Sequence, residues 1–339
     1  MKIPELRALA GKYSKEELQY LVVELYRAMP KKLKEEKEID KLFLEPGQVG
    51  NHTEQGKKTV SVDLRTLGPE IEEFLENAYQ QNYMVPNRVI PKKDRPKWRF
   101  LVKSYIRSLQ KVPAANGVKA AELLEKLYRM LCYSCCYYLF NTEDPFRSVG
   151  IEQTEIYDMV ASKLLENDMS REHLRRAVEL AVLDGLDRWT LPEDLFAVLL
   201  RHLKIPDTRQ AAREETEKLR EEAGKKWAEQ QKGRKGSGYS RSEFWFHERN
   251  NHLTELIFHL YAHQGEFEQG IQDYKNHSME RNPEITLYRL LRLLAMYDEA
   301  GLWKQEYEKA VKKKISPRTQ LQKVYQYVTV YGQLPEGEA

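Results

Sequence analysis

The 339-residue sequence lacks the features of several large protein classes. Gly (17) and Pro (14) are scarce, which disfavours an all-β fold, because such a fold needs a turn about every 8–12 residues. Three cysteines are too few for a disulfide framework. The longest nearly apolar run, residues 131–140, has about half of the roughly 20 residues that a membrane helix needs. These absences predict a helical protein in a reducing environment, without a membrane span.

The sequence also lacks a signal for export and a signature of catalysis. The N-terminus has no apolar segment of the signal-peptide type, so we expect a cytoplasmic protein. No P-loop and no nucleophile-elbow motif occurs, which favours a non-enzymatic role. The net charge of +3 excludes a bulk polycation that coats nucleic acid, although a local basic patch is still allowed.

Helix signals are dense in what the sequence does contain. Charged residues make up 32% of the chain and apolar residues 41%, which suits thin helical layers better than one large spherical core. A capping box at Ser14 and Glu17 opens the first helix, which Pro30 ends. Helical periodicity predicts further helices over residues 31–44, 69–83, 96–111, 117–141, 152–166, 170–184, 191–203, 206–231, 241–264, 266–277, 283–299, 302–314 and 317–331. Residues 45–68 and 143–150 are expected to be loops.

The helix predicted over 117–141 is the most apolar of these. Its C-terminal half is apolar nearly all round, which indicates a central, buried helix. Cys132, Cys135 and Cys136 lie in that half, and we interpret them as small buried side chains rather than as a redox or metal motif.

A polar stretch in the second half of the chain suggests a division into domains. Residues 206–231 have almost no apolar stripe, so they form either a solvated helix or a spacer that is helical only part of the time. A Gly-rich tract follows. We therefore predict an all-α fold in three parts, with an N-terminal helical bundle domain (1–205), a charged helical spacer with a linker (206–239) and a layer of helical hairpins (240–335).

The last part carries small and aromatic residues at regular positions. They are Leu253, Leu256, Ile257, Tyr261, Gly265, Phe267, Gly270, Ile271 and Tyr274, with Pro283 beyond. A weaker copy follows 36 residues later, where Tyr297, Gly301 and Trp303 match the pattern and Glu306 departs from it. The pattern resembles the tetratricopeptide repeat, in which small residues let two helices pack closely. The resemblance implies a concave face that binds a protein or peptide; a plain helical layer without a groove is the alternative.

Positive charge is concentrated in the segment 86–111, which has a net charge of +8, whereas residues 143–203 carry −6. The segment contains Arg88, Lys92, Lys93, Arg95, Lys97, Arg99, Lys103, Arg107 and Lys111. Arg99, Lys103 and Arg107 recur every four residues and share one helix face, with Phe100 expected on the inward side. Such a face can bind nucleic acid or an acidic protein, or it can be a solvated face or pair with this chain's own acidic residues.

A second candidate surface is a stripe of histidine and glutamate. Glu248, His252, Glu255, His259 and His263 follow each other at steps of four or three, so they share one face of the helix expected over 241–264. Imidazole and carboxylate groups suit zinc, iron or manganese, which makes His252, His259 and His263 candidate ligands of a divalent metal. The alternatives to metal binding are that the stripe is a solvated polar face or the polar wall of a groove.

These observations lead to three hypotheses about function. The leading one is a non-enzymatic scaffold or adaptor that binds a protein or peptide on its C-terminal helical layer and needs no cofactor. The second is a nucleic-acid-associated factor that uses the segment 86–111. The third is a metal-dependent hydrolase at the histidine stripe.

Overall fold

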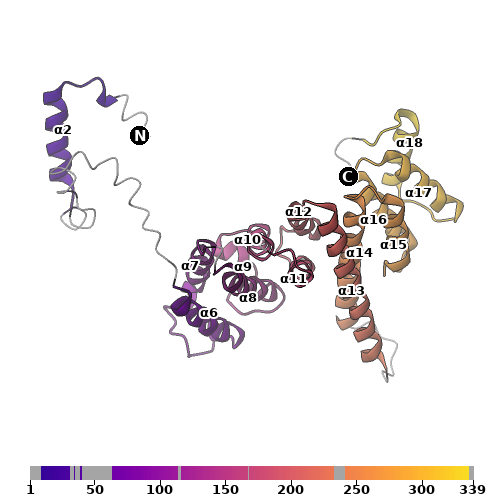
Figure 1. The fold of residues 1–339 in the computed structure, drawn as a ribbon, viewed down its shortest axis with the longest axis horizontal. Coiled ribbons are helices and arrows are strands. Elements are labelled where there is room, and N and C mark those ends of the chain that lie inside the picture. Colours follow the sequence, from indigo (N-terminus) through magenta and orange to yellow (C-terminus); the bar gives the residue numbers. More distant parts are fainter. Residues whose placement is uncertain are drawn as a thin grey trace. The chain divides into compact units, whose positions relative to one another are not determined.

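The computed structural model describes residues 9–30, 34, 39, 63–113, 116–166, 168–232 and 241–335, and these residues form helices and no strand (Figure 1). The all-α prediction is therefore confirmed. The chain forms two compact units, Met1–Ser61 and Val62–Ala339.

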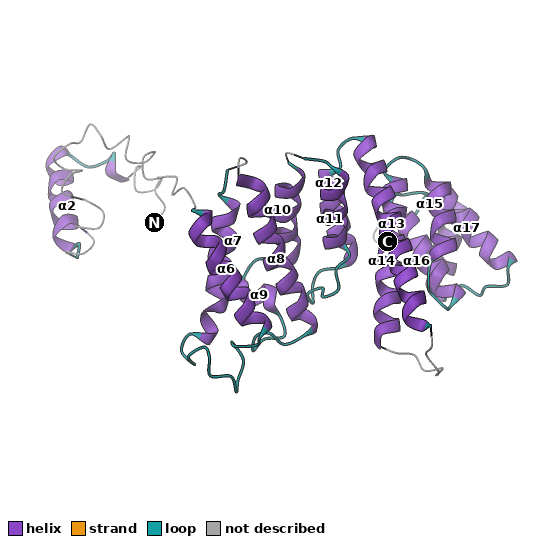
Figure 2. Cartoon of the chain, turned by 60° about the horizontal axis from the view of Figure 1, so that its bottom comes forward, coloured by secondary structure: helices purple, strands orange, loops and turns teal. Residues whose placement is uncertain are grey.

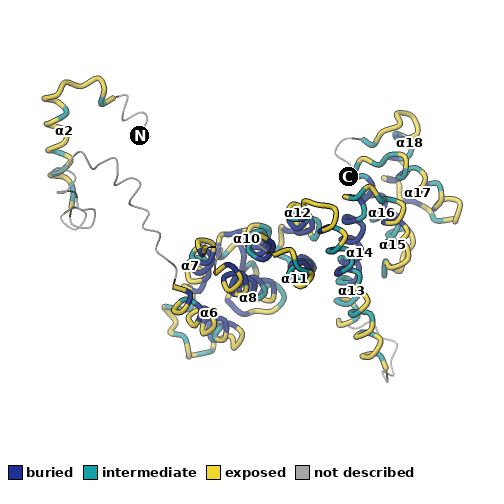
Figure 3. Tube along the Cα trace, viewed as in Figure 1, coloured by how far each residue is buried: buried dark blue, intermediate teal, exposed yellow. Residues whose placement is uncertain are grey.

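In the first unit the predicted capping box is confirmed at the start of helix α2 (Lys15–Ala28). The Glu17 N–H donates to Ser14 Oγ at 3.2 Å, and the Ser14 N–H donates to Glu17 Oε2 at 2.7 Å. Met29 has an extended backbone and ends the helix before Pro30, since a residue before proline disfavours helical angles. No residue of α2 is buried (Figure 3). Most of the helix predicted over 31–44 lies outside the described residues, as does residue range 45–62 of the predicted loop.

The second unit is a row of helices in which each contacts its neighbours (Figure 2). The helices are α6 (Leu64–Tyr79), the 3-10 turn η2 (Arg95–Lys97), α7 (Trp98–Gln110), α8 (Gly117–Cys136), α9 (Pro145–Val149), α10 (Gln153–Leu165), α11 (Arg171–Ala181), α12 (Pro192–His202), α13 (Pro206–Gln231), α14 (Arg241–Ala262), α15 (Phe267–His277), α16 (Pro283–Met296), α17 (Ala300–Lys312) and α18 (Thr319–Tyr331).

The loop prediction is wrong at two places. Helix α6 begins at Leu64 rather than at residue 69, because Asp63 caps it by accepting a hydrogen bond from the Arg65 N–H at 2.9 Å. Pro69 then lies inside the helix, where the burial of Leu64 and its neighbours outweighs the cost of the proline. The segment 143–150 contains the short helix α9, which the Asp144 carboxylate caps.

Helix α8 is largely buried, as predicted, and contacts α6, α7, α9 and α10, but it ends at Cys136 rather than at residue 141. Tyr137 has an extended backbone there. Tyr133 and Tyr137 are exposed and stack on each other with ring centroids 4.6 Å apart. The expectation that this half is buried is therefore wrong at the tyrosines, because their rings pack on each other while one edge stays in water. Cys132 is buried, whereas Cys135 and Cys136 are half-buried.

Helix α13 is a continuous, packed helix of 26 residues rather than a solvated or intermittent one. It packs against α11 and α14, and Ala212, Thr216 and Leu219 are among its buried residues. Its charged residues form ion pairs with neighbouring helices, such as Glu222 with Arg175 of α11 at 2.7 Å. Because ion pairs replace part of the apolar contact, the sequence shows almost no apolar stripe. The division at 206–239 stays a prediction.

The turns that join α14 to α15 and α16 to α17 have the same backbone hydrogen bonds. The Glu266 N–H donates to the Tyr261 carbonyl at 3.0 Å, and the Glu299 N–H donates to the Leu294 carbonyl at 3.1 Å. This is the six-residue bond of a Schellman motif. The equivalent residues 266 and 299 are 33 positions apart, so the predicted match at a spacing of 36 residues is not the structural one. Membership of the tetratricopeptide family stays a prediction.

Close packing of α15 on α14 depends on Gly270. A Cβ added there would lie 3.1 Å from the Cβ of Tyr261 and 3.3 Å from Phe258 Cδ2. At Gly224, inside α13, no atom outside the helix backbone lies within 4 Å of an added Cβ among the described residues. An alanine at residue 270 would therefore press on Tyr261 and Phe258, whereas an alanine at residue 224 would contact no other part of the described chain.

We predict that Gly270→Ala lowers the free energy of unfolding by about 1–3 kcal/mol, because the added methyl group forces the helices apart. Gly224→Ala is the matched control and should raise it by up to about 1 kcal/mol, since alanine is the better helix former. Urea denaturation followed by circular dichroism measures both. Equal gains in the two variants would contradict the close packing.

Candidate functional site

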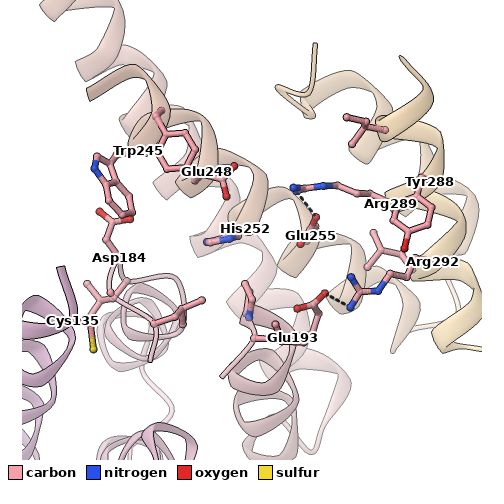
Figure 4. A pocket seen from close by; sticks show the side chains of 18 of the residues that line it. Cys135, Asp184, Glu193, Trp245, Glu248, His252, Glu255, Tyr288, Arg289 and Arg292 are labelled. Carbon is pink, nitrogen blue, oxygen red and sulfur yellow. Dashed lines mark hydrogen bonds and ion pairs between the residues drawn. The ribbon is translucent and has the colours of Figure 1, made fainter. Parts of the chain in front are cut away.

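A groove of about 800 Å³ lies between the connection of α11 to α12, the outer face of α14, and α16 (Figure 4). Much of its lining is apolar, including Leu191, Phe244, Trp245, Tyr288, Leu293 and Met296. Several of these side chains are open to solvent: Leu191 is 53% exposed, Met296 45% and Phe244 42%. A cluster of large exposed apolar side chains marks a surface that binds a partner.

Helix α14 supplies the polar wall of this groove. Trp245, Glu248, His252 and Glu255 are three or four residues apart, so they lie on one helix face, and all four line the groove. The predicted stripe is therefore split. Its first three members, Glu248, His252 and Glu255, face the groove, whereas the last two do not line it.

Each arginine of the groove is held by a carboxylate. The pairs are Arg289 Nη1 with Glu255 Oε1 at 3.4 Å, Arg292 Nη2 with Glu193 Oε1 at 3.0 Å, and Arg318 Nη2 with Glu284 Oε2 at 2.7 Å. The first two pairs join α16 to α14 and to α12 across the groove (Figure 4). They hold the walls in place, so the groove is formed before any ligand binds.

Other titratable groups of the groove lack such a partner. Asp184 and Glu248 accept no hydrogen bond and join no ion pair among the described residues. Burial raises the pKa of Asp184 and lowers the pKa of His252, which keeps this imidazole neutral at pH 7. Burial also raises the pKa of Glu255 to about 7, against the opposing effect of Arg289. The charge that is left without a partner in the groove is therefore negative.

The three histidines predicted to bind a metal are not brought together. His252 faces the groove, whereas His259 is buried behind it with its Nδ1 2.6 Å from the hydroxyl of Tyr297. His263 is exposed and lies edge-on to the same tyrosine ring. Within the part of the chain that the structure describes, no three His, Cys, Asp or Glu side chains form a group that could hold a metal ion. The helical wheel places these residues on one face but cannot show that the neighbouring helices cover half of that face.

The predicted basic segment 86–111 is partly used by the fold itself. Arg95 donates to the backbone carbonyls of Asn87 and Ile90, Lys97 pairs with Asp94 at 2.7 Å, and Lys103 Nζ donates to the Gly150 carbonyl at 3.1 Å. These three cations therefore hold the start of α7 and the connection after α9. Arg95 and Lys103 are therefore engaged with the backbone, whereas Lys97 is still 61% exposed on the surface.

The remaining cations of the segment stay on the surface, and we call them the basic face: Arg88, Lys92, Lys93, Arg99, Arg107 and Lys111. Within the described residues, none of these six side chains forms a hydrogen bond or an ion pair. The guanidinium of Arg99 lies 4.9 Å from the ring centroid of Phe100, which is 61% exposed. The expectation that Phe100 points inward is wrong, because Trp98 and Val102 fill the core side of α7 instead.

A second groove, of about 900 Å³, lies beside α9, α10 and α12. Three of its aspartates serve the local backbone. Asp144 accepts from the Arg147 N–H at 3.0 Å, Asp187 from the Trp189 N–H at 2.8 Å, and Asp194 from the Leu191 N–H at 2.8 Å. Because these carboxylates cap helices and turns, the groove along α14 is the better candidate site.

Sequence reasoning missed most of the groove. Trp245 shares the helix face of Glu248, so extending the stripe by one turn would have found it. Asp184, Glu193 and the arginines of α16 come from other parts of the chain, and no local signal marks them.

Comparison of the chain with protein-family models, with curated proteins and with solved structures gives no match. Among the described helices, none is long and apolar enough to cross a membrane. The candidate function therefore rests on the geometry of the groove and of the basic face.

We predict that His259 makes the stability of the protein depend on pH. Burial lowers its pKa from 6.5 to about 4, so the unfolded chain takes up this proton first as the pH falls. The contribution of the neutral ring is complete above about pH 6.5 and is lost between about pH 6.5 and 4, with a total on the order of 3 kcal/mol. Denaturation across this range should show a smaller pH dependence for His259→Gln than for the wild type.

His263→Gln is the control, because that histidine is exposed and should change the pH dependence much less. Identical pH dependence in the wild type and His259→Gln would contradict the burial of a neutral His259.

Proposed function

We propose that this protein is a non-enzymatic binding protein that holds a peptide segment of a partner protein in the groove along α14. The observation that carries the proposal is an apolar groove, open to solvent, whose walls are fixed by ion pairs between α12, α14 and α16. A preformed groove with apolar contacts and a few charged groups suits an extended peptide or a short helix.

The cysteines beside the groove support binding rather than nucleophilic catalysis. Cys135 and Cys136 line it, and burial raises the pKa of both thiols. A reactive cysteine needs a lowered pKa, because the thiolate is the nucleophile. The hairpins α14–α15 and α16–α17, which resemble tetratricopeptide repeats in their sequence, add to the case, since such arrays bind peptides on a concave face.

Peptide display against the full chain tests this proposal. We predict that selected peptides bind the wild type and lose about tenfold or more in affinity with Met296→Glu, because the new charge stands in the apolar part of the groove. Fluorescence polarisation measures the affinities.

Val330→Glu is the matched control, since Val330 is also an exposed apolar residue on a helix but does not line the groove. Affinities that are unchanged by Met296→Glu, or that fall equally in both variants, would contradict binding in this groove.

The basic face supports a second candidate function, which is binding to nucleic acid. The specific observation is an exposed Arg99–Phe100 pair beside five further cations that have no ion-pair partner among the described residues. Aromatic rings and arginine planes stack on unpaired bases, while the cations neutralise phosphates.

A salt titration tests this second function with single-stranded DNA as the probe. Affinity should fall log-linearly with salt, and Lys92→Gln/Lys93→Gln/Arg107→Gln should reduce the slope by about 2 to 3. The control Lys312→Gln/Lys313→Gln/Lys323→Gln removes three exposed lysines elsewhere and should leave the slope unchanged. Absence of binding at low salt would remove this candidate.

A further inference from the structure

We infer that the peptide bound along α14 carries an arginine or lysine side chain, which the groove holds between Trp245, Glu248 and Asp184. This inference rests on the proposed function and adds the chemistry of the partner.

The charges of the groove favour a ligand that carries a cation. The arginines of the groove are already engaged with carboxylates of the chain, at distances of 2.7–3.4 Å. Asp184 and Glu248 have no such partner among the described residues. A ligand with a carboxylate would therefore compete with existing ion pairs and meet two uncompensated negative charges. A ligand with a cation would instead pair with these two carboxylates.

Trp245 adds an aromatic ring to this part of the groove. It precedes Glu248 by three residues on α14, and side chains at this spacing are neighbours on a helix surface. Figure 4 shows Trp245 beside Asp184, which the α11–α12 connection contributes, and Glu248 further along the same wall of the groove. Tryptophan is the best aromatic partner for a cation over its ring face. An indole face with two carboxylates offers stacking and hydrogen-bond acceptors together, which suits the planar guanidinium of arginine in particular.

The charged groups of the chain around Asp184 and Glu248 compensate these carboxylates only in part. Arg249 acts to lower the pKa of Asp184 but forms no ion pair with it, and the net effect of burial is still to raise that pKa. Glu248 and Arg289 attract each other, yet the Arg289 guanidinium donates to Glu255. His252, the remaining titratable neighbour on α14, is kept neutral by burial. The compensation from the chain itself is therefore incomplete, and a cation from outside would complete it.

Apolar side chains surround the place proposed for the cation. Phe244 precedes Trp245 and is exposed at the same end of α14, and Met296 is exposed on the α16 side. Apolar side chains on both sides of a charged pocket suit a peptide in which apolar residues flank the basic one. Such contacts exclude water and strengthen the charge interaction.

A positional peptide library tests the inference with the full chain. One position is fixed in turn as Arg, Lys, Gln, Glu or Leu, the remaining positions are mixed, and binding is read by fluorescence polarisation. We expect the Arg and Lys pools to bind about tenfold more tightly than the Gln and Glu pools, which corresponds to a charge-assisted contact of about 1.4 kcal/mol. Glu248→Gln and, independently, Asp184→Asn should each reduce this preference severalfold.

The control Glu229→Gln removes an exposed carboxylate of α13 outside the groove and should leave the preference unchanged. Glu248→Lys should shift the preference toward the Glu pool. Circular dichroism confirms that each variant is folded, and Asp184→Asn, on a different segment, covers the case in which a variant of α14 does not fold.

The outcomes separate this inference from the proposed function. If no pool binds the wild type, the proposed function and the inference both fail. If pools bind and Met296→Glu abolishes the binding, but Arg and Lys have no advantage, the groove binds peptides and the inference alone is wrong. An advantage for Arg and Lys that survives both Glu248→Gln and Asp184→Asn would also overturn it.

Discussion

A buried arginine, Arg220 of α13, ties α13 and α15 to α14, the helix that forms one wall of the groove. Its guanidinium donates to both oxygens of Asp273 on α15, at 2.7 and 2.8 Å, and to the hydroxyl of Thr254 on α14 at 3.4 Å. A buried charge is tolerated only when it is paired and hydrogen-bonded, and removing one partner typically costs about 3–5 kcal/mol. Helices α13 and α15 are therefore fixed to α14, which leaves one face of α14 free to form the wall of the groove.

This contact also explains why α13 was hard to interpret from its sequence. The standard signal for a packed helix is an apolar stripe, and α13 packs instead through Arg220, small residues and ion pairs to α11. The other helices follow the standard signals more closely. The capping box at Ser14 and the apolar residues of α8 predicted where these two helices begin, because these signals lie within the elements themselves. The start of α6 was missed because the burial of Leu64 is decided by other helices.

The candidate site shows the same limit of local information. Periodicity placed Glu248, His252 and His259 on one face, but only the packed neighbours decide that the first two face a groove and the third faces the core. His259 bonds to Tyr297, which lies 38 residues further along the chain, directly after α16. Glu306 is a similar case, since it departs from the repeat pattern but is buried with Lys275 and Lys309 as its partners. A polar residue at an apolar position can be read correctly only when its partner is known.

The near-zero net charge of the chain conceals how its charges are used. Many arginines serve the fold, as Arg220, Arg289 and Arg292 do, and these cations are not available to ligands. The charges that the fold leaves unpaired are negative in the groove along α14. On the basic face, before and along α7, they are positive. A single ligand of uniform charge cannot satisfy both. The two surfaces therefore suit partners, or parts of one partner, with opposite charge, so charge complementarity limits which partner each surface accepts.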